Sequence, residues 1–398
     1  MLKPTEINKY LFVENPFEFK SEIPRFLSPE ETVPVRRVHF ALPSYEPTPL
    51  VELKGLAGHL GLRSVLIKDE SDRFGLKAFK GLGGVYAVFR AVCDRFGLDY
   101  TALTIEDLKR DPLLMEAIGR LHLVTATDGN HGKGVSWAAG MLGCQAHVYM
   151  PVGSLEVRAQ AIRDAGNAEV EIMDLGYDDS VRYADRMAHE NGWLLIQDTS
   201  WEGYEIVPSW IIQGYSTLVY EAVEQMKELG YDRPTHVFLQ AGVGAMAGGV
   251  LGVFRNLYDD DMPCVAIAEP HEAACIYESM AVYDGKPHTA TGNGVTIMAG
   301  LNCGEPCTIT WPSIRDTAGW SFSCPDSCSV LGTKVLADPI NGDSPVESGE
   351  SGSVTTGLLY TICTDPAFAE VRSKMGLNEN SVVFMVNTEG YTNPDLEK

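Results

Sequence analysis

The chain has 398 residues, and its 54 acidic residues outnumber its 31 basic ones, so the formal net charge at neutral pH is −23. A field of that sign repels nucleic acid and anionic membrane surfaces, so we expect neither as a partner. The length predicts two domains, and the lack of an apolar leader or a long apolar run predicts a cytoplasmic protein without membrane spans.

The N-terminal part of the chain is predicted to contain an arm, two helices and one strand. Residues 1–40 show no strong periodicity, so we expect an arm that packs on the surface. A helical pattern covers 51–60, a β-rich run covers 64–68, and a second helical pattern covers 85–96.

A lysine stands just before the second of these helices, on a close-packed turn. Phe79 and Lys80 follow a polar loop at 69–73 and precede glycines at 81, 83 and 84. This position suits an amine that is held against a bound ring, although most lysines are simply exposed to solvent.

From residue 121 the sequence alternates apolar runs with amphipathic stretches, a pattern typical of a parallel sheet. Strands are predicted at 121–126, 146–150, 168–173 and 193–197, with helices between them.

Polar loops follow the first and the last of these strands. The backbone amides of 127–132 can hold a carboxylate, and Asn130 can hydrogen-bond a ligand oxygen. Asp128 could instead cap the following helix. We expect His131 to be a packing residue, since no metal-binding partner lies at helical spacing. The second polar loop begins with Asp198.

A glycine-rich turn at 241–249 joins a predicted strand, 235–240, to a helix. Small residues allow a close approach of the backbone, and free amides at a helix start bind phosphate. The spacing of Gly242, Gly244 and Ala247 also matches a dinucleotide fingerprint, with Glu269 at a suitable distance for a ribose hydroxyl. A turn without a ligand is the third possibility.

The C-terminal part adds a helix after 347–353 and a strand at 382–386, followed by the turn 387–390. The nine cysteines include no Cys-x-x-Cys pair, which predicts reduced thiols and no metal site. Cys275 and Cys303 could pair, but sequence does not decide this.

Several short motifs occur in the order found in fold-type II pyridoxal-phosphate enzymes, and the resemblance spans residues 44–390. The motifs are Thr48 to Leu50, Lys68 with Glu70, Phe79 with Lys80, Gly129 to His131, the turn 242–246, and Thr388 to Gly390. Within that superfamily, the strings at 69–76, 127–132, 197–204 and 240–249 resemble the diaminopropionate ammonia-lyase family.

The resemblance implies an α/β fold with two open, twisted, mostly parallel sheets and helices on both faces. A large domain that binds pyridoxal phosphate would cover 1–82 plus 206–398, and a small domain would cover 83–205. It also implies a homodimer.

The same resemblance implies roles for individual residues. Lys80 would carry the cofactor as a Schiff base, Asn130 would contact the ring hydroxyl, and Thr388 would face the pyridine nitrogen. The implied cofactor-binding residues are Phe79, Lys80, Asn130, Gly242, Val243, Gly244, Ala245, Met246, Glu350 and Thr388. The implied substrate-binding residues are Thr127, Asp128, Gly129 and Asp198, and the implied catalytic residues are Lys80, Asp128 and Asp198.

Two departures from the wider superfamily bear on the substrate, an amino acid. Ala78 and Asp128 stand where many dehydratases have serine, and a carboxylate at 128 attracts a second ammonium. The resemblance therefore implies α,β-elimination of 2,3-diaminopropionate to pyruvate and ammonia, with Lys80 and Asp128 as bases on opposite faces, one for each enantiomer. The alternatives are a serine or threonine dehydratase, a β-replacement synthase, or a nucleotide-binding oxidoreductase.

Overall fold

The computed structural model describes residues 1–259 and 261–391, and the chain divides into two compact units. The larger unit comprises 1–24, 47–72 and 218–398, and the smaller unit comprises 25–46 and 73–217. The predicted small domain, 83–205, lies wholly within the smaller unit, whose boundaries are wider because three further segments, 25–46, 73–82 and 206–217, pack with it.

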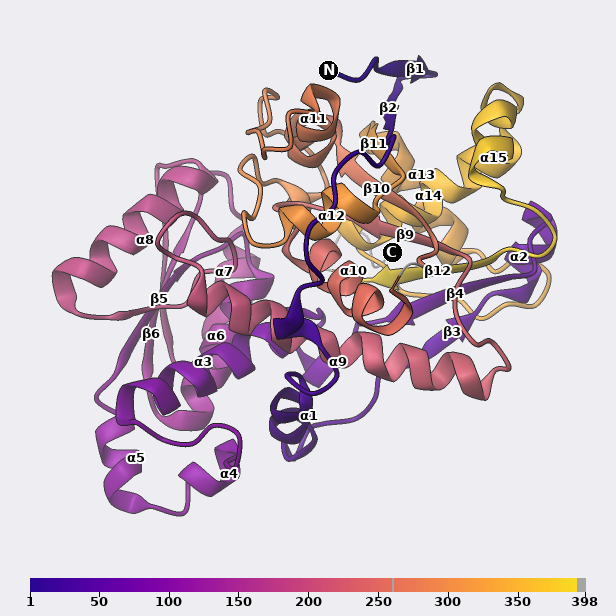
Figure 1. Ribbon diagram of the computed structural model, residues 1–398. Coiled ribbons are helices and arrows are strands. Elements are labelled where there is room, and N and C mark those ends of the chain that lie inside the picture. Colours follow the sequence, from indigo (N-terminus) through magenta and orange to yellow (C-terminus); the bar gives the residue numbers. More distant parts are fainter. Residues whose placement is uncertain (260, 392–398) are drawn as a thin grey trace. The chain divides into compact units, whose positions relative to one another are not determined.

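The smaller unit is built on a four-stranded sheet in the order β7-β6-β5-β8, in which every neighbouring pair is parallel. Figure 1 labels its two central strands, β5 and β6. Its strands are β5 (His122–Ala126), β6 (Gln145–Met150), β7 (Ala168–Ile172) and β8 (Leu194–Leu195). Its helices are α1 (Val33–Phe40), α3 (Lys80–Phe96), α4 (Ile105–Leu108), α5 (Pro112–Ile118), α6 (Asn130–Leu142), α7 (Glu156–Ala165), α8 (Tyr177–Asn191) and the first half of α9 (Ile206–Glu228).

Glycines allow α3 and α6 to pack with their backbones close together. A Cβ atom on Gly84 would lie 2.9 Å from the carbonyl carbon of Gly134, and one on Gly134 would lie 3.1 Å from the carbonyl oxygen of Lys80. Side chains at these positions would push the helices apart. The contact therefore places the first turn of α3, with Lys80, close to α6.

The larger unit is built on an eight-stranded sheet in the order β1-β2-β11-β10-β9-β12-β4-β3. The central pairs are parallel, whereas the pairs β1–β2, β2–β11 and β3–β4 at the edges are antiparallel. Its strands are β1 (Thr5–Ile7), β2 (Tyr10–Glu14), β3 (Leu50–Glu52), β4 (Ser64–Asp69), β9 (His236–Gln240), β10 (Cys264–Pro270), β11 (Trp320–Cys324) and β12 (Val382–Asn387). Its helices are α2 (Lys54–Leu60), the second half of α9, α10 (Ala245–Tyr258), α11 (Cys275–Val282), α12 (Trp311–Thr317), α13 (Asp326–Ala337), α14 (Glu350–Thr364) and α15 (Ala369–Met375).

The central strands of this sheet form its core. Every residue of β9, β11 and β12 is buried, as expected for strands that are covered on both faces. The predicted fold class, two mostly parallel sheets with helices, is confirmed.

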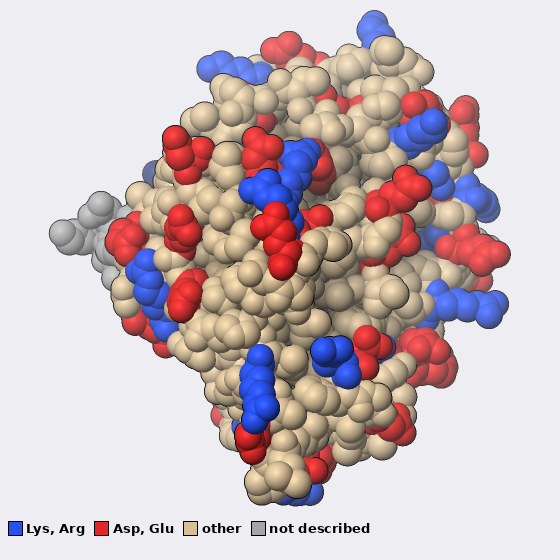
Figure 2. Space-filling view, turned by 90° about the vertical axis from the view of Figure 1, so that its left-hand side faces the viewer, with Lys and Arg blue, Asp and Glu red and all other residues tan. Residues whose placement is uncertain are grey.

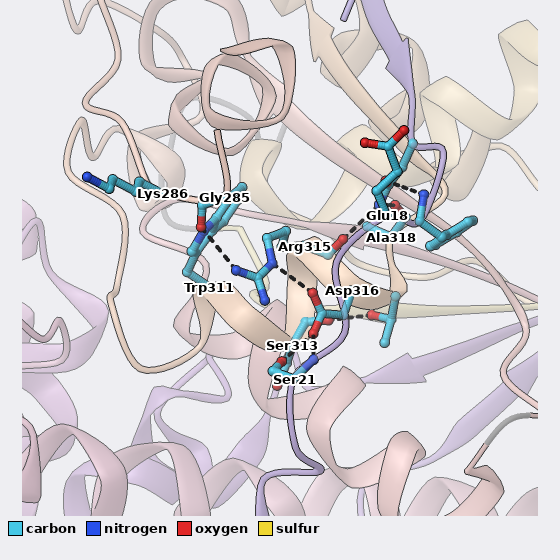
Figure 3. Close-up of polar contacts among 12 residues, drawn as sticks. Glu18, Ser21, Gly285, Lys286, Trp311, Ser313, Arg315, Asp316 and Ala318 are labelled. Atoms are coloured by element: carbon cyan, nitrogen blue, oxygen red, sulfur yellow. Dashed lines mark hydrogen bonds and ion pairs between the residues drawn. The ribbon is translucent and has the colours of Figure 1, made fainter. Parts of the chain in front are cut away.

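The N-terminal arm differs from the prediction, because residues 10–14 form a strand of the larger sheet. β2 pairs antiparallel with β11, and the ring of Phe12 lies 5.2 Å from that of Phe322. Farther along, the backbone amide of Ser21 donates to Asp316, which also accepts from Arg315 (Figure 3). The arm is thus part of the fold, and the expectation of a surface segment was wrong.

The predicted helix at 51–60 is divided in the structure. Its first residues belong to β3, where Val51 pairs with Ile67 of β4, and helix α2 begins only at Lys54. The β-branched Val51 and the edge of β4 explain the difference, since pairing with a neighbouring strand outweighs local helical periodicity.

Acidic and basic side chains are interspersed on the face shown in Figure 2, and lysine and arginine do not gather there into one patch. Among the described residues, none of the helices combines the length and apolar character needed to cross a bilayer.

Candidate active site

Lys80 is the first residue of α3, and its ammonium donates a hydrogen bond to Asp198, just beyond β8. The exposed fractions of the two side chains are 19% and 5%. Burial lowers the pKa of Lys80, but the charge of Asp198 outweighs it and raises the pKa above its ordinary value. Burial likewise raises the pKa of Asp198, but His131 and Lys80 outweigh it and lower the pKa to about 2.

Three further side chains surround Asp198. His131 Nδ1 lies 3.9 Å from Asp198 Oδ2, while His131 Nε2 lies 2.7 Å from the carbonyl oxygen of Ile196. Tyr177 and Gln197 donate to Asp198 Oδ1 at 3.5 and 3.3 Å. Burial lowers the pKa of His131, so this ring is neutral at pH 7, as befits the predicted packing residue.

Tyr177 and Gln197 were missed by the sequence reasoning. Gln197 ends the predicted strand at 193–197, and its side chain reaches back to accept from the amide of Ala126. Tyr177 begins α8 after a glycine. Gln197 opens the string 197–204 that carries part of the family resemblance, although no role was assigned to it, whereas Tyr177 carries no comparable sequence signal.

The loop between β5 and α6 is held by Thr127. Its Oγ1 accepts from the amides of Gly129 and Gly132, at 2.9 and 3.3 Å. The N-cap residue of α6 is Gly129, at φ 151°, a conformation that favours glycine, so Asp128 is not the cap that was considered above.

Asp128 and Asn130 therefore flank a glycine at the start of α6. Asn130 is the first residue of the helix. The charge of Asp128 is also felt by Lys80: burial, which lowers the pKa of Lys80, is the largest influence on it, and Asp198 and, more weakly, Asp128 raise it. One lysine thus interacts with two carboxylates.

Phe79 and Lys68 both contact other side chains of the protein. The ring of Phe79 lies 4.8 Å from that of Tyr215, and Lys80 Nζ lies 5.5 Å from the Phe79 ring. Lys68 is fully buried, and its ammonium donates to Glu221 at 2.7 Å and to the carbonyl oxygen of Thr48 at 2.5 Å. Lys68 is therefore committed to packing the larger unit.

The glycine turn of the larger unit has the form that the sequence predicted. It leads from β9 to α10, with Gly244 as N-cap in the left-handed region at φ 86°. Within the described parts of the chain, the amides of Gly242, Val243 and Gly244 have no hydrogen-bond acceptor. A Cβ atom on Gly242 would lie 3.2 Å from Leu301 Cα. These amides form a cradle for an anion.

Glu269 does not support the dinucleotide alternative. Its carboxylate is fully buried and accepts from the amides of Ile276 and Tyr277 at 2.8 and 2.7 Å, at the start of α11. Burial raises the pKa of Glu269 to about 8. A ribose hydroxyl would have to compete with these two amides, so the alternative is wrong.

Thr388 directly follows β12, and its exposed fraction is 6%. Gln240 donates to Thr388 Oγ1 at 3.0 Å, which leaves the hydroxyl proton of Thr388 to be donated to another acceptor. Glu350 begins α14, and this helix start lies beside Thr388, since a Cβ atom on Gly352 would be 3.2 Å from the Thr388 nitrogen.

The predicted site residues therefore form one group in each unit. Phe79, Lys80, Thr127, Asp128, Gly129, Asn130 and Asp198 lie in the smaller unit, and Gly242, Val243, Gly244, Ala245, Met246, Glu350 and Thr388 lie in the larger unit.

Comparison with known proteins identifies similar sequences and structures. The pattern of the family described as pyridoxal-phosphate dependent enzyme matches residues 41–338. Diaminopropionate ammonia-lyase of Salmonella typhimurium is 48% identical over 359 residues, which cover 90% of this chain and 88% of that protein.

Two crystal structures of diaminopropionate ammonia lyase from Escherichia coli are similar to this chain, each at 42% sequence identity. The complex with D-serine has a TM-score of 0.90 and covers 99% of this chain and 96% of that chain. The complex with an aminoacrylate-PLP azomethine reaction intermediate has a TM-score of 0.89 and covers 100% of this chain and 96% of that chain.

Proposed function

Since the chain belongs to the pyridoxal-phosphate dependent enzymes and, among them, to the diaminopropionate ammonia-lyases, we propose that it converts 2,3-diaminopropionate and water into pyruvate and ammonia. Two ammonia molecules form for each pyruvate, because both amino groups of the substrate are lost. Of the two carbon–nitrogen bonds, the one that joins the β-carbon to its nitrogen breaks first in this scheme, after loss of the α-proton.

Each of the two groups contains residues whose chemistry suits one part of pyridoxal phosphate. The unpartnered amides of Gly242, Val243 and Gly244, with Ala245 and Met246 at the start of α10, provide a cradle for its phosphate. Thr388 has a hydroxyl proton to donate to the pyridine nitrogen. Lys80 is the amine for its aldehyde. The proposed roles of Asn130, Phe79 and Glu350 near the ring rest on the family resemblance.

The observation that carries the choice of substrate is the pair of carboxylates that act on Lys80. A substrate with two ammonium groups gains from both Asp128 and Asp198, whereas serine or threonine offers a neutral hydroxyl in place of the second ammonium. We therefore favour a diamino acid over the substrates of the dehydratases. Thr127 and Gly129 shape the adjoining loop and are proposed to contact the substrate carboxylate.

Pyridoxal phosphate, when bound, draws electron density from the α-carbon and so acidifies its proton. We propose that Lys80 removes this proton from the L isomer and Asp128 removes it from the D isomer. Asp198 orients the amine of Lys80 through their hydrogen bond. In this proposal the group that faces the pyridine nitrogen is the neutral hydroxyl of Thr388 and not a carboxylate. A neutral partner favours elimination over reactions that need a long-lived carbanion.

Product stoichiometry tests the proposal. The purified enzyme is given each pure enantiomer of diaminopropionate, and pyruvate and ammonia are measured separately by coupled dehydrogenases. We expect twice as much ammonia as pyruvate and a higher kcat/KM than with L- or D-serine. A preference for serine, which releases equal amounts of the two products, would favour the dehydratase alternative instead.

We also infer a homodimer that works in the cytoplasm. All nine cysteines are free, which suits a reducing compartment, and the dimer rests on the family resemblance. Light scattering in solution should give twice the mass of one chain.

A further inference from the structure

Arg158, the third residue of α7, lies beside Asp128 in the smaller unit. Its Nη1 lies 3.8 Å from Asp128 Oδ2 and donates to the carbonyl oxygen of Asp128 at 3.4 Å. The exposed fractions of the two side chains are 17% and 25%. The stem of Arg158 covers Gly129, since a Cβ atom on that glycine would lie 3.7 Å from Arg158 Cδ. The guanidinium thus contacts both the side chain and the backbone at position 128.

The charges around Asp128 come from three helices and one strand end. Lys80 at the start of α3 interacts with Asp128 but also donates to Asp198, which follows β8 and lies near His131 of α6. Arg158 comes from α7. An opposite charge within about 4–6 Å favours the ionised form of a carboxyl group, and a guanidinium does not lose its proton in proteins.

We propose that Arg158 is a positioning residue for Asp128, which it holds ionised and oriented as the base for the D isomer. This inference rests on the proposed function. The carboxylate takes the α-proton, and the electrons of that C–H bond form the double bond. The β-nitrogen leaves as ammonia with the electrons of its bond, and Asp128 then releases the proton to solvent.

The geometry separates this role from substrate binding. An arginine that acted only on the substrate would affect both enantiomers, because the L and D isomers carry the same groups. An arginine that acts through Asp128 affects kcat mainly for the isomer whose proton Asp128 removes, whereas the attraction of Asp128 for the second ammonium is common to both isomers and affects KM. It also affects that isomer mainly at low pH, where an unassisted carboxylate becomes protonated.

The pH dependence of kcat, measured at saturating concentrations of each enantiomer, tests the proposal, using the holoenzyme and Arg158→Gln. With the D isomer we expect a loss that grows as the pH falls and approaches about tenfold on the acid limb of the profile, below the pKa of the base in both enzymes, because a shift of one unit in that pKa corresponds there to a factor of ten. At pH 9 the D-isomer loss should be no more than about threefold, and with the L isomer we expect less than about threefold loss at any pH. Arg158→Lys, which retains the charge, should recover most of the D-isomer rate on the acid limb.

A second arginine of the same helix provides the control. Arg163 pairs with Glu156 of α7 at 2.6 Å. Arg163→Gln therefore removes an arginine charge from α7 without removing the contact with Asp128. The pH profiles of both isomers should match those of the parent enzyme.

An independent measurement needs no turnover. In protein labelled with ¹³C at the aspartate carboxyl carbons, the resonance that is missing from Asp128→Asn reports the ionisation of Asp128. Its titration midpoint should be higher in Arg158→Gln than in the parent and close to the parent value in Arg158→Lys.

Two outcomes would overturn the inference: equal losses with both isomers, or an unchanged midpoint of the Asp128 resonance in Arg158→Gln. Failure of the proposed function has a different signature. The parent enzyme would then act on neither isomer, whereas the carboxyl resonance would still show whether Arg158 controls Asp128. Circular dichroism of each variant establishes that the fold is retained.

Discussion

Asp198 accepts a hydrogen bond from the ammonium of Lys80 in a largely buried environment. The family resemblance implied catalytic roles for both residues, but the sequence gives no sign that they contact each other, because 118 residues separate them. What the sequence did reveal was that both residues follow strands or precede helices. Their meeting depends on the sheet order of the smaller unit, which local patterns do not determine.

Replacement of Asp198 by asparagine should change stability with pH. The pKa of Asp198 is lowered to about 2, so its contribution is present above the ordinary value of 3.8 and is lost as pH falls toward 2. We expect cofactor-free Asp198→Asn to be less stable than the parent at pH 7 by about 2 kcal/mol from this titration alone. Urea unfolding at pH 7, 4 and 2.5 should show the gap closing, and a constant gap would contradict the ion pair.

Replacement of Lys80 by alanine should abolish the visible absorbance of the bound cofactor and all turnover, because Lys68 is fully buried and bonded to other groups. Spectra of the purified protein, followed by borohydride reduction and peptide mapping of the parent, provide the measurement. Lys77→Ala serves as the control, since Lys77 is exposed in the same loop. Label on Lys77 or Lys68 would show that Lys80 is not the cofactor lysine.

At the scale of secondary structure, the apolar runs of the parallel strands were sufficient to predict most of the sheet. β5, β6, β7, β9 and β12 lie within one residue of their predicted limits. β9 and β12 are buried throughout and mostly apolar, whereas the edge strand β7 was recognisable from its alternation of apolar and acidic residues. The edges were harder, because β3 and β2 are short and their pairing partners, not their own composition, make them strands.

The glycine turn before α10 should not tolerate a side chain at 244. A Cβ atom there would lie 2.8 Å from Ile314 Cδ1, in a backbone at φ 86°. We expect Gly244→Ala to weaken pyridoxal phosphate binding at least about tenfold in a fluorescence titration, because the amides of the cradle would shift.

Gly230→Ala is the matched control for that turn. Gly230 has a similar φ of 84°, and nothing lies within 4 Å of the position that a Cβ atom would occupy. Gly230→Ala therefore introduces backbone strain without a steric clash. Both variants should lose about 1–2 kcal/mol of stability, but only Gly244→Ala should lose cofactor affinity. Equal affinity in the two variants would show that the turn does not hold the phosphate.

The close contact between α3 and α6 should also be sensitive to an added side chain. In Gly84→Ala the new methyl group would meet Gly134 at 2.9 Å, and we expect a loss of about 1–3 kcal/mol in thermal or urea unfolding. Gly58→Ala, within α2 and with nothing within 4 Å, should instead gain about 0.5–1 kcal/mol. Similar changes in the free energy of unfolding of the two variants would mean that α3 and α6 can separate to accommodate the methyl group.

At the scale of the whole molecule, the larger unit is assembled from three segments of the chain, and the smaller unit from two. This interleaving explains why no linker is visible in the sequence. It also explains why the role of the N-terminal arm was not predicted, because β2 pairs with a strand about 300 residues later, with Glu14 opposite Trp320. Register with so distant a partner depends on the completed fold.

Removal of residues 1–14 should therefore damage the larger sheet. β11, whose residues are all buried, would lose its antiparallel neighbour, and an uncovered strand edge invites pairing between chains. We expect the truncated chain to aggregate on heating and to unfold at a lower temperature than a control that lacks only residues 1–3, which precede β1.

Phe12→Ala separates the two contributions of this strand. It keeps the backbone pairing of β2 but removes the ring that lies 5.2 Å from Phe322. We expect a loss of about 3–5 kcal/mol in urea unfolding, as for other buried phenylalanines, without aggregation of the native protein. If the truncated chain stayed dispersed and melted with the control, β2 would be dispensable. In that case β11 would be a stable edge strand of the larger sheet, and only the side chains that cover it would protect its free edge.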